Sequence, residues 1–196
     1  MALPKPDWTE AEYLAFERAS DIKHELMDGE VRAMSGASER HNLIVASTLA
    51  SLFTQLRGKG CKIYPSDMRV RVGLRREFTY PDLSIVCGTP IMADDYNDTL
   101  LNPTVIIEVL SASTESYDRG RKFTRYRTIE SLQEYILIAQ DYVQIERFVR
   151  QANNQWLLTD LQCADGIIEL MSVGCTLAAA DVYEQVTFEN TPPPET

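Results

Sequence analysis

A glutamate interrupts one of the most apolar stretches of the chain. Glu108 lies in the middle of Thr104-Val-Ile-Ile-Glu-Val-Leu110, where its neighbours predict a buried strand. An unpaired carboxylate inside a protein costs several kcal/mol, so buried acids are normally paired or neutralised. We therefore expect a cation, a proton or a charged partner at this position.

A second carboxylate occupies a similar place. Asp82 belongs to Tyr80-Pro-Asp-Leu-Ser-Ile-Val86 and stands at the start of another apolar strand. Side chains alternate between the two faces of a strand. If the two predicted strands are neighbours with these faces aligned, the carboxylates of Asp82 and Glu108 converge.

Convergent carboxylates favour a hard cation such as Mg²⁺ or Mn²⁺, which takes one or two carboxylates together with water and substrate oxygens. Such an ion lowers the pKa of a bound water and stabilises charge that develops on phosphorus. Lys122, on the predicted helix that follows, could orient or deprotonate this water, or stabilise the charge as a cation. These residue types predict a metal-dependent hydrolase.

The elements that must position these residues follow from local patterns. Thr9 and Glu12 form a capping box that predicts a helix over residues 9–19. Asp28-Gly29 predicts a tight hairpin within residues 23–34. A long helix is expected over residues 38–56, and His41 extends its apolar stripe by one turn. The stripe is predicted to contain Val45, Leu49, Leu52, Phe53 and Leu56.

Further along, residues 61–72 and 78–87 predict two strands around a polar turn, and residues 88–103 a polar excursion. Asp118 is interpreted as the N-cap of a helix that ends near Ile129, with Lys122 and Tyr126 on one face. We interpret Tyr126 as a packing residue. Later strands are predicted at 134–139, 143–150, 156–161 and 167–171, before a short helix near 180–185.

Composition places the chain among ordinary globular proteins. It has 196 residues, 44% hydrophobic and 24% charged, which predicts a single domain over 1–189 and a disordered tail over 190–196. No stretch approaches the roughly 20 apolar residues of a membrane span. The N-terminus lacks the apolar core of a secretory signal, so we expect a cytoplasmic protein without membrane partners. Four scattered cysteines favour reduced core thiols over a disulfide framework.

The charge balance narrows the partners. A formal net charge of −10 argues against broad attraction to nucleic acid. Two local clusters of basic residues soften this objection: Arg119, Arg121, Lys122, Arg125 and Arg127, and Arg69, Arg71, Arg75 and Arg76. A serine hydrolase is disfavoured because no G-x-S-x-G motif is present.

An ordered set of motifs points to one family. The set comprises Glu25-Leu-Met-Asp-Gly-Glu30, His41, Tyr80-Pro-Asp82, Glu108-Val-Leu-Ser111, Asp118, Lys122, Tyr126 and Glu134-Tyr-Ile136. Over about residues 9–186 it resembles the PD-(D/E)XK, or restriction-endonuclease-like, superfamily, and within it a large bacterial family of predicted endonucleases. The resemblance implies an α/β fold with a mixed central sheet flanked by helices, to which an N-terminal helix and hairpin and C-terminal strands are added.

The same resemblance implies an endonuclease that hydrolyses DNA with Mg²⁺ or Mn²⁺. Asp82, Glu108 and the backbone carbonyl of Val109 would hold the metal. The superfamily pattern has lysine two residues after the glutamate, where this chain has Leu110; the related family supplies its lysine from the following helix, here Lys122.

Several alternatives stay open at this level. His41 is either a core or capping histidine or a catalytic base, and Glu25 either an exposed strand glutamate or a catalytic residue. Double-strand cleavage would favour a homodimer. The rival to an endonuclease is a catalytically silent module of the same fold that binds DNA or protein.

Overall fold

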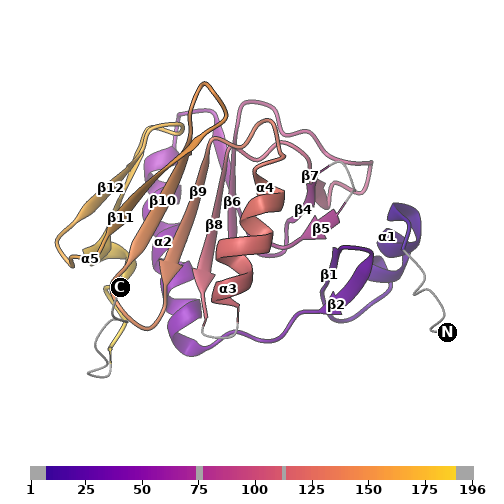
Figure 1. Ribbon diagram of the computed structural model, residues 1–196, viewed down its shortest axis with the longest axis horizontal. Coiled ribbons are helices and arrows are strands. Elements are labelled where there is room, and N and C mark those ends of the chain that lie inside the picture. Colours follow the sequence, from indigo (N-terminus) through magenta and orange to yellow (C-terminus); the bar gives the residue numbers. More distant parts are fainter. Residues whose placement is uncertain (1–7, 74–76, 112–113, 189–196) are drawn as a thin grey trace.

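A six-stranded mixed sheet forms the centre of the molecule (Figure 1). The computed structural model describes residues 8–73, 77–111 and 114–188. The strand order is β11-β10-β9-β8-β6-β3; β8 and β9 are parallel and the other neighbours antiparallel. The strands are β3 (Cys61–Pro65), β6 (Leu83–Cys87), β8 (Val105–Leu110), β9 (Glu134–Ala139), β10 (Ile145–Arg150) and β11 (Trp156–Leu161).

A second sheet lies beside the first, next to helix α1 (Glu10–Arg18), at the right of Figure 1. Its order is β2-β1-β5-β4-β7. Its strands are β1 (His24–Met27), β2 (Glu30–Ala33), β4 (Arg69–Val72), β5 (Glu77–Thr79) and β7 (Thr99–Leu100). At the opposite end of the molecule, β12 (Ile167–Leu170) and β13 (Cys175–Ala178) form a hairpin that leads into α5 (Ala179–Val182).

The N-terminal predictions are confirmed. Thr9 and Glu12 make the predicted capping box at the start of α1. Asp28 and Gly29 connect β1 to β2 with φ angles of 52° and 74°. Positive φ at both central residues is what a two-residue type I′ hairpin turn requires.

Helices cover both faces of the main sheet (Figure 1). Along β8, Ile107 and Val109 join the apolar core beneath α2 (Glu39–Leu56), whereas Ile106 and Leu110 belong to the core on the opposite face. That opposite face is covered by a continuous helix from Glu115 to Tyr126. Because strand side chains alternate, Glu108 points to the face covered by this second helix.

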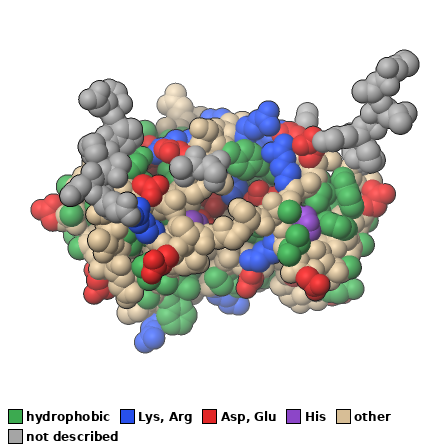
Figure 2. Space-filling model, turned by 90° about the horizontal axis from the view of Figure 1, so that it is seen from below, with side chains coloured by type: hydrophobic (Ala, Val, Ile, Leu, Met, Phe, Trp, Pro, Cys, Tyr) green, Lys and Arg blue, Asp and Glu red, His purple; other side chains and the backbone are tan. Residues whose placement is uncertain are grey.

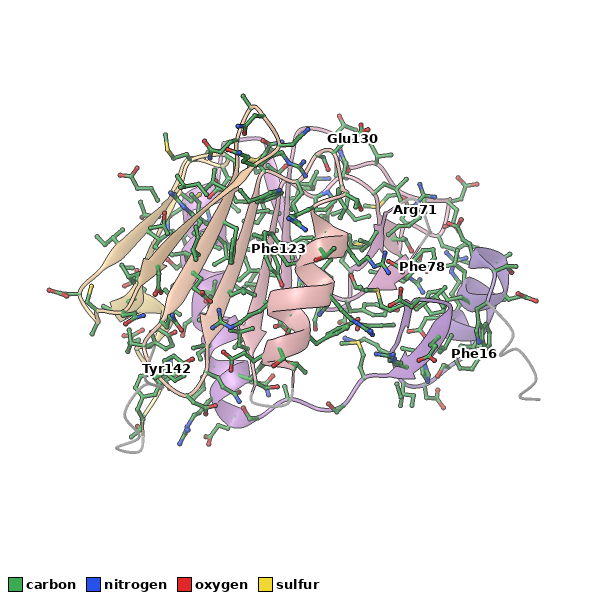
Figure 3. All side chains as sticks on the ribbon, in the orientation of Figure 1. Phe16, Arg71, Phe78, Phe123, Glu130 and Tyr142 are labelled. Atoms are coloured by element: carbon green, nitrogen blue, oxygen red, sulfur yellow. A yellow bond between two sulfur atoms is a disulfide. The ribbon has the colours of Figure 1, made fainter. Side chains whose placement is uncertain are left out.

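The aromatic side chains of this second helix anchor it to the sheet. Phe123 stacks on Tyr135 of β9 at 5.1 Å between ring centroids and contacts Phe148 of β10 (Figure 3). Tyr126 meets Tyr135 edge to face at 5.4 Å. These contacts fix which helix residues face β8.

The prediction of two long strands over residues 61–72 and 78–87 is wrong. Each splits in two, with β3 and β6 in the main sheet and β4 and β5 in the second sheet. A turn at Ser66-Asp67 separates β3 from β4. Tyr80-Pro81 separates β5 from β6, because proline offers no N–H to a strand ladder. This second break places Asp82 at the entrance of β6.

The helix from Glu115 to Tyr126 begins earlier and ends earlier than predicted. α3 (Glu115–Tyr117) precedes Asp118, a π-helical turn η1 covers Asp118–Lys122, and α4 ends the helix (Phe123–Tyr126). Asp118 is therefore not an N-cap. Its side chain is buried and faces Lys122 one turn along, so its preference for caps was overridden by a charged partner.

The cysteine prediction is wrong for one pair. Cys61 and Cys87 lie directly opposite each other on β3 and β6 and form a disulfide, whereas Cys163 and Cys175 are free thiols. A spacing of 26 residues in the sequence does not reveal that two strands pair in this register.

On α2 the apolar stripe is centred on Ile44, Thr48, Leu52 and Leu56, and the predicted member Phe53 is 54% exposed.

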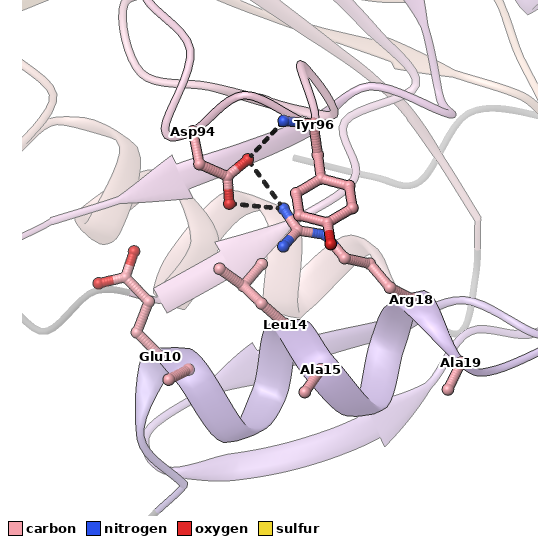
Figure 4. A pocket seen from close by; sticks show the side chains of 8 residues that line it. Glu10, Leu14, Ala15, Arg18, Ala19, Asp94 and Tyr96 are labelled. Carbon is pink, nitrogen blue, oxygen red and sulfur yellow. Dashed lines mark hydrogen bonds and ion pairs between the residues drawn. The ribbon is translucent and has the colours of Figure 1, made fainter.

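The polar excursion predicted at 88–103 is held against α1 and contains a short strand. It contains β7, and Arg18 of α1 binds Asp94 and Asp98 while lying 4.0 Å from the centre of the Tyr96 ring (Figure 4). An open cavity of about 750 Å³ runs along this side of α1 and contains none of the predicted site residues. β13 was also missed by the sequence patterns.

Two predictions concern residues outside the described ranges. The expected tail at 190–196 and the arginines at 75 and 76 lie outside the described residues. Among the helices that are described, none has both the length and the apolar content needed to cross a bilayer.

Candidate active site

The two predicted carboxylates meet where β6 and β8 pair. Leu83 lies opposite Ile107, and continuing this register by one residue sets Asp82 opposite Glu108. The backbone N–H of Val109 donates to Oδ2 of Asp82 at 2.7 Å, and the N–H of Asp82 makes a longer contact of 3.4 Å with Oε2 of Glu108. The strand pairing therefore fixes both side chains relative to each other.

Lys122 reaches back from the helix to the strand glutamate. Its Nζ lies 2.8 Å from Oε1 of Glu108, and it also contacts Asp118 at 3.4 Å and Glu25 at 3.5 Å. Lys122 is only 6% exposed and Glu108 only 3%. A buried ammonium surrounded by three carboxylates is an ion-pair network, in contrast to a surface lysine.

Two more side chains complete the surroundings of the carboxylates. Nε2 of His41, on the first turn of α2, lies 3.2 Å from Oδ2 of Asp82. The hydroxyl of Tyr126 donates to Oε1 of Glu108 at 2.8 Å. Glu25 on β1 contacts the backbone N–H of Tyr80 at 3.4 Å and so links the second sheet to the segment that carries Asp82.

The site holds an excess of negative charge. Burial raises the pKa of Glu108 to about 8; the Lys122 charge opposes this shift, while Asp82 and Asp118 add to it. Burial likewise raises the pKa of Asp118. For Lys122, burial alone would lower the pKa, but Glu108, Glu25 and Asp118 outweigh it and hold the pKa well above its ordinary value. One lysine does not neutralise four carboxylates, so the site favours an additional proton or cation.

The donor set suits a hard divalent cation. This donor set is small, since no three His, Cys, Asp or Glu side chains within the described ranges are grouped so that they could hold a metal ion together. Asp82 and Glu108 supply two carboxylates, the number that Mg²⁺ commonly takes together with water and substrate oxygens. An extended residue directs its N–H and C=O to the same side of the strand, so the Val109 carbonyl points to the side of β8 on which Asp82 lies. Among the described contacts, Oδ1 of Asp82 accepts no hydrogen bond.

The five predicted catalytic side chains are brought together by four elements and one connecting segment. They are Glu25 of β1, His41 of α2, Asp82 before β6, Glu108 of β8 and Lys122 of η1. Sequence reasoning missed the contributions of Asp118, taken for a cap, and Tyr126, taken for packing alone. Their signal was the four-residue spacing on either side of Lys122, which places all three on one helix face.

The residues of the predicted basic clusters differ in exposure and in ion pairing. Arg121 is exposed, but Arg125 binds Asp28 and Glu77, and Arg69 is buried against Asp98. Figure 2 shows the lower face of the molecule, where Lys and Arg side chains stand among Asp and Glu. Among the described members of the two clusters, Arg69 and Arg125 are therefore paired with acidic side chains of the protein.

Comparison with known proteins places this site in a family. The model of the Uma2 family, described as putative restriction endonuclease, matches residues 10–180. The chain belongs to the Uma2 family. Two uncharacterised proteins of Synechocystis sp. (strain ATCC 27184 / PCC 6803 / Kazusa) are similar to this Uma2 chain. One, slr1290, is 34% identical and covers 94% of this chain and 96% of its own length. The other, sll1609, is 35% identical and covers 82% and 91%.

A solved structure supports the fold of this Uma2 protein. The chain is similar to a putative nuclease belonging to DUF820 from Anabaena variabilis ATCC 29413, with a TM-score of 0.70 and 16% identity, over 89% of this chain and 96% of that one. The predicted restriction-endonuclease-like α/β fold is confirmed.

Proposed function

We propose that this Uma2 protein is a Mg²⁺- or Mn²⁺-dependent endonuclease that hydrolyses phosphodiester bonds in DNA. One observation carries the proposal: Lys122, from the helix, lies 2.8 Å from the buried Glu108, and the next residue of that strand donates its N–H to Asp82. Burying this much charge destabilises a fold unless the charges are fully compensated, so a site with an excess of carboxylates is consistent with a bound cation. Family membership supports the same reading.

Asp82, Glu108 and the carbonyl of Val109 would hold the divalent cation. When bound, such an ion supplies Lewis-acid stabilisation of the phosphate and acidifies a water molecule. Burial raises the pKa of Glu108, so binding of a cation to this carboxylate would be coupled to the release of a proton.

The chain's own residues have distinct roles in this proposal. Lys122 stays protonated, because its pKa is raised well above its ordinary value, so it stabilises the charge on the phosphate and does not act as the base. Glu25 and Asp118 hold its ammonium in place. Nε2 of His41 lies 3.2 Å from Oδ2 of Asp82, and because a carboxylate only accepts hydrogen bonds, His41 would hold this ligand in place by donating to it.

Cleavage of DNA by purified variants tests the proposal. With Mg²⁺ or Mn²⁺, the natural chain should nick or cut DNA, and Asp82→Asn, Glu108→Gln and Lys122→Met should each reduce the rate at least 100-fold, as removal of single charge-stabilising groups commonly does. Glu130→Gln removes an exposed carboxylate outside the site and serves as the control (Figure 3). Cleavage that survives all three site changes would rule out this assignment.

The silent-module alternative rests on Leu110, which occupies the usual lysine position and is 3% exposed in the core. It predicts DNA or protein binding that is the same with EDTA as with Mn²⁺.

Cutting both strands of a duplex would use two copies of the chain related by two-fold symmetry. Sedimentation of the protein with DNA would measure this stoichiometry.

A further inference from the structure

Two hydroxyl groups in series lead to Oε1 of Glu108. The Tyr126 hydroxyl donates to Oε1 of Glu108 at 2.8 Å and lies 3.0 Å from Oγ1 of Thr79 on β5. All three side chains are buried, with Tyr126 and Thr79 at 0% exposure. Tyr126 of α4 thus connects Thr79 of the second sheet to the strand glutamate.

Packing alone does not explain this hydroxyl. The Tyr126 ring contacts Tyr135 and belongs to the apolar core with Leu110, contacts that a phenylalanine ring would also make. A buried hydroxyl costs free energy unless it is hydrogen-bonded, so its value lies in the bonds it makes. Those bonds end on a carboxylate oxygen of the proposed metal site.

The two oxygens of Glu108 are treated differently. Oε1 receives both the Tyr126 hydroxyl and the Lys122 ammonium, each at 2.8 Å. Within the described part of the chain, the hydrogen bond to Oε2 is the 3.4 Å contact from the N–H of Asp82. Two donors on one oxygen fix the rotation of the carboxylate and leave the other oxygen directed at Asp82.

We propose that Tyr126, held by Thr79, is a positioning residue that orients Glu108 so that Oε2 can bind the divalent cation. This inference rests on the proposed function. Groups that hydrogen-bond to metal-ligating carboxylates typically contribute 10- to 100-fold to metal affinity or activity. The loss of the hydroxyl should therefore weaken metal binding while the ring keeps the fold.

Mn²⁺ affinity, measured by calorimetry on the full chain, tests the role of the hydroxyl. Tyr126→Phe should weaken Mn²⁺ binding about 10- to 100-fold. Its cleavage of DNA should fall at low Mn²⁺ and recover at saturating Mn²⁺, which a general loss of folded protein would not produce. Tyr183→Phe is the matched control, since Tyr183 is also buried but its hydroxyl bonds to backbone atoms of Ala139 and Gln144.

A second pair of variants keeps the test informative if Tyr126→Phe folds poorly. Thr79→Val removes the hydroxyl that holds Tyr126 and should weaken Mn²⁺ binding, but less than Tyr126→Phe does, whereas Thr79→Ser should restore it. Equal Mn²⁺ affinity of the natural chain and Tyr126→Phe, or of Thr79→Val if Tyr126→Phe is unfolded, overturns the positioning role alone. Absence of Mn²⁺ binding by the natural chain overturns both this role and the proposed function.

Discussion

Single side chains at the site are stable only in combination. Glu108, Asp118 and Lys122 are each more than nine-tenths buried, and each would be costly alone. Lys122 compensates part of the negative charge, and the Tyr126 hydroxyl adds a hydrogen bond to Glu108. The lysine is therefore a structural as well as a proposed catalytic residue.

Lys122→Met should destabilise the metal-free chain. The variant keeps the length of the side chain but leaves Glu108 and Asp118 buried without their cation, which costs about 3 kcal/mol in comparable buried pairs. Urea denaturation at pH 8 measures the free energy of unfolding. Arg121→Met, which changes the neighbouring exposed side chain, should cost less than about 0.5 kcal/mol; equal effects of both changes would contradict the buried network.

The stability of the metal-free chain should depend on the protonation of Glu108. Its pKa is about 8 in the folded chain and its ordinary value is 4.5, so the folded chain holds a proton that the unfolded chain releases between these values. The contribution to stability is complete below about pH 4.5 and is lost as the pH rises through about 8. Denaturation series from pH 5 to 8.5 should show a steeper decline for the natural chain than for Glu108→Gln. Parallel curves would contradict the raised pKa.

The sequence pointed to the proposed metal ligands more clearly than to the residues that surround them. Asp82 and Glu108 were visible because a charge in an apolar strand is anomalous. Asp118 and Tyr126 were not, because an aspartate near a helix start and a tyrosine on an apolar face both have ordinary explanations. Only the position of Lys122 relative to β8 shows that Asp118 contacts the buried ammonium and that Tyr126 contacts the carboxylate paired with it.

Among the secondary-structure elements, the β6–β8 pairing determines the geometry of the site. The break at Tyr80-Pro81 ends β5 in one sheet and places Asp82 just before β6 in the other. Local patterns predicted α1, the hairpin, α2, β8 and β9. They did not predict the change of sheet, because hydrophobic alternation reports which residues are buried but not which strands pair.

The disulfide between β3 and β6 should stabilise this part of the sheet. Closing a loop with a separation of 26 residues contributes about 3 kcal/mol in chain-entropy estimates. Reduction by dithiothreitol should lower the free energy of unfolding by an amount of this order. The double variant Cys61→Ser, Cys87→Ser should be insensitive to the reductant; the same sensitivity in both proteins would contradict a contribution from this bond.

At the scale of the whole molecule, net charge opposes the proposed partner. A chain with a net charge of −10 gains little from DNA phosphates except through local basic side chains. Arg121 is the exposed arginine next to Lys122, with 69% of its side chain accessible. We expect weak DNA binding that depends on few phosphate contacts.

Arg121→Ala should weaken DNA binding without affecting the fold. Loss of one phosphate contact lowers the slope of log affinity against log salt by about 1 and acts on all DNA sequences alike. Fluorescence anisotropy at several salt concentrations measures this slope. Arg57→Ala, at the far end of α2, is the control; identical slopes for Arg121→Ala and the natural chain would exclude Arg121 from the DNA contact.

The location of a bound cation tests the central claim most directly. Crystals of the protein grown with Mn²⁺ and a DNA oligonucleotide would give an anomalous difference map at the manganese absorption edge. The account predicts a peak between the carboxylates of Asp82 and Glu108, next to the Val109 carbonyl, with Lys122 facing the phosphate. A map without a peak there, while Lys122 still occupies its place against Glu108, would contradict it.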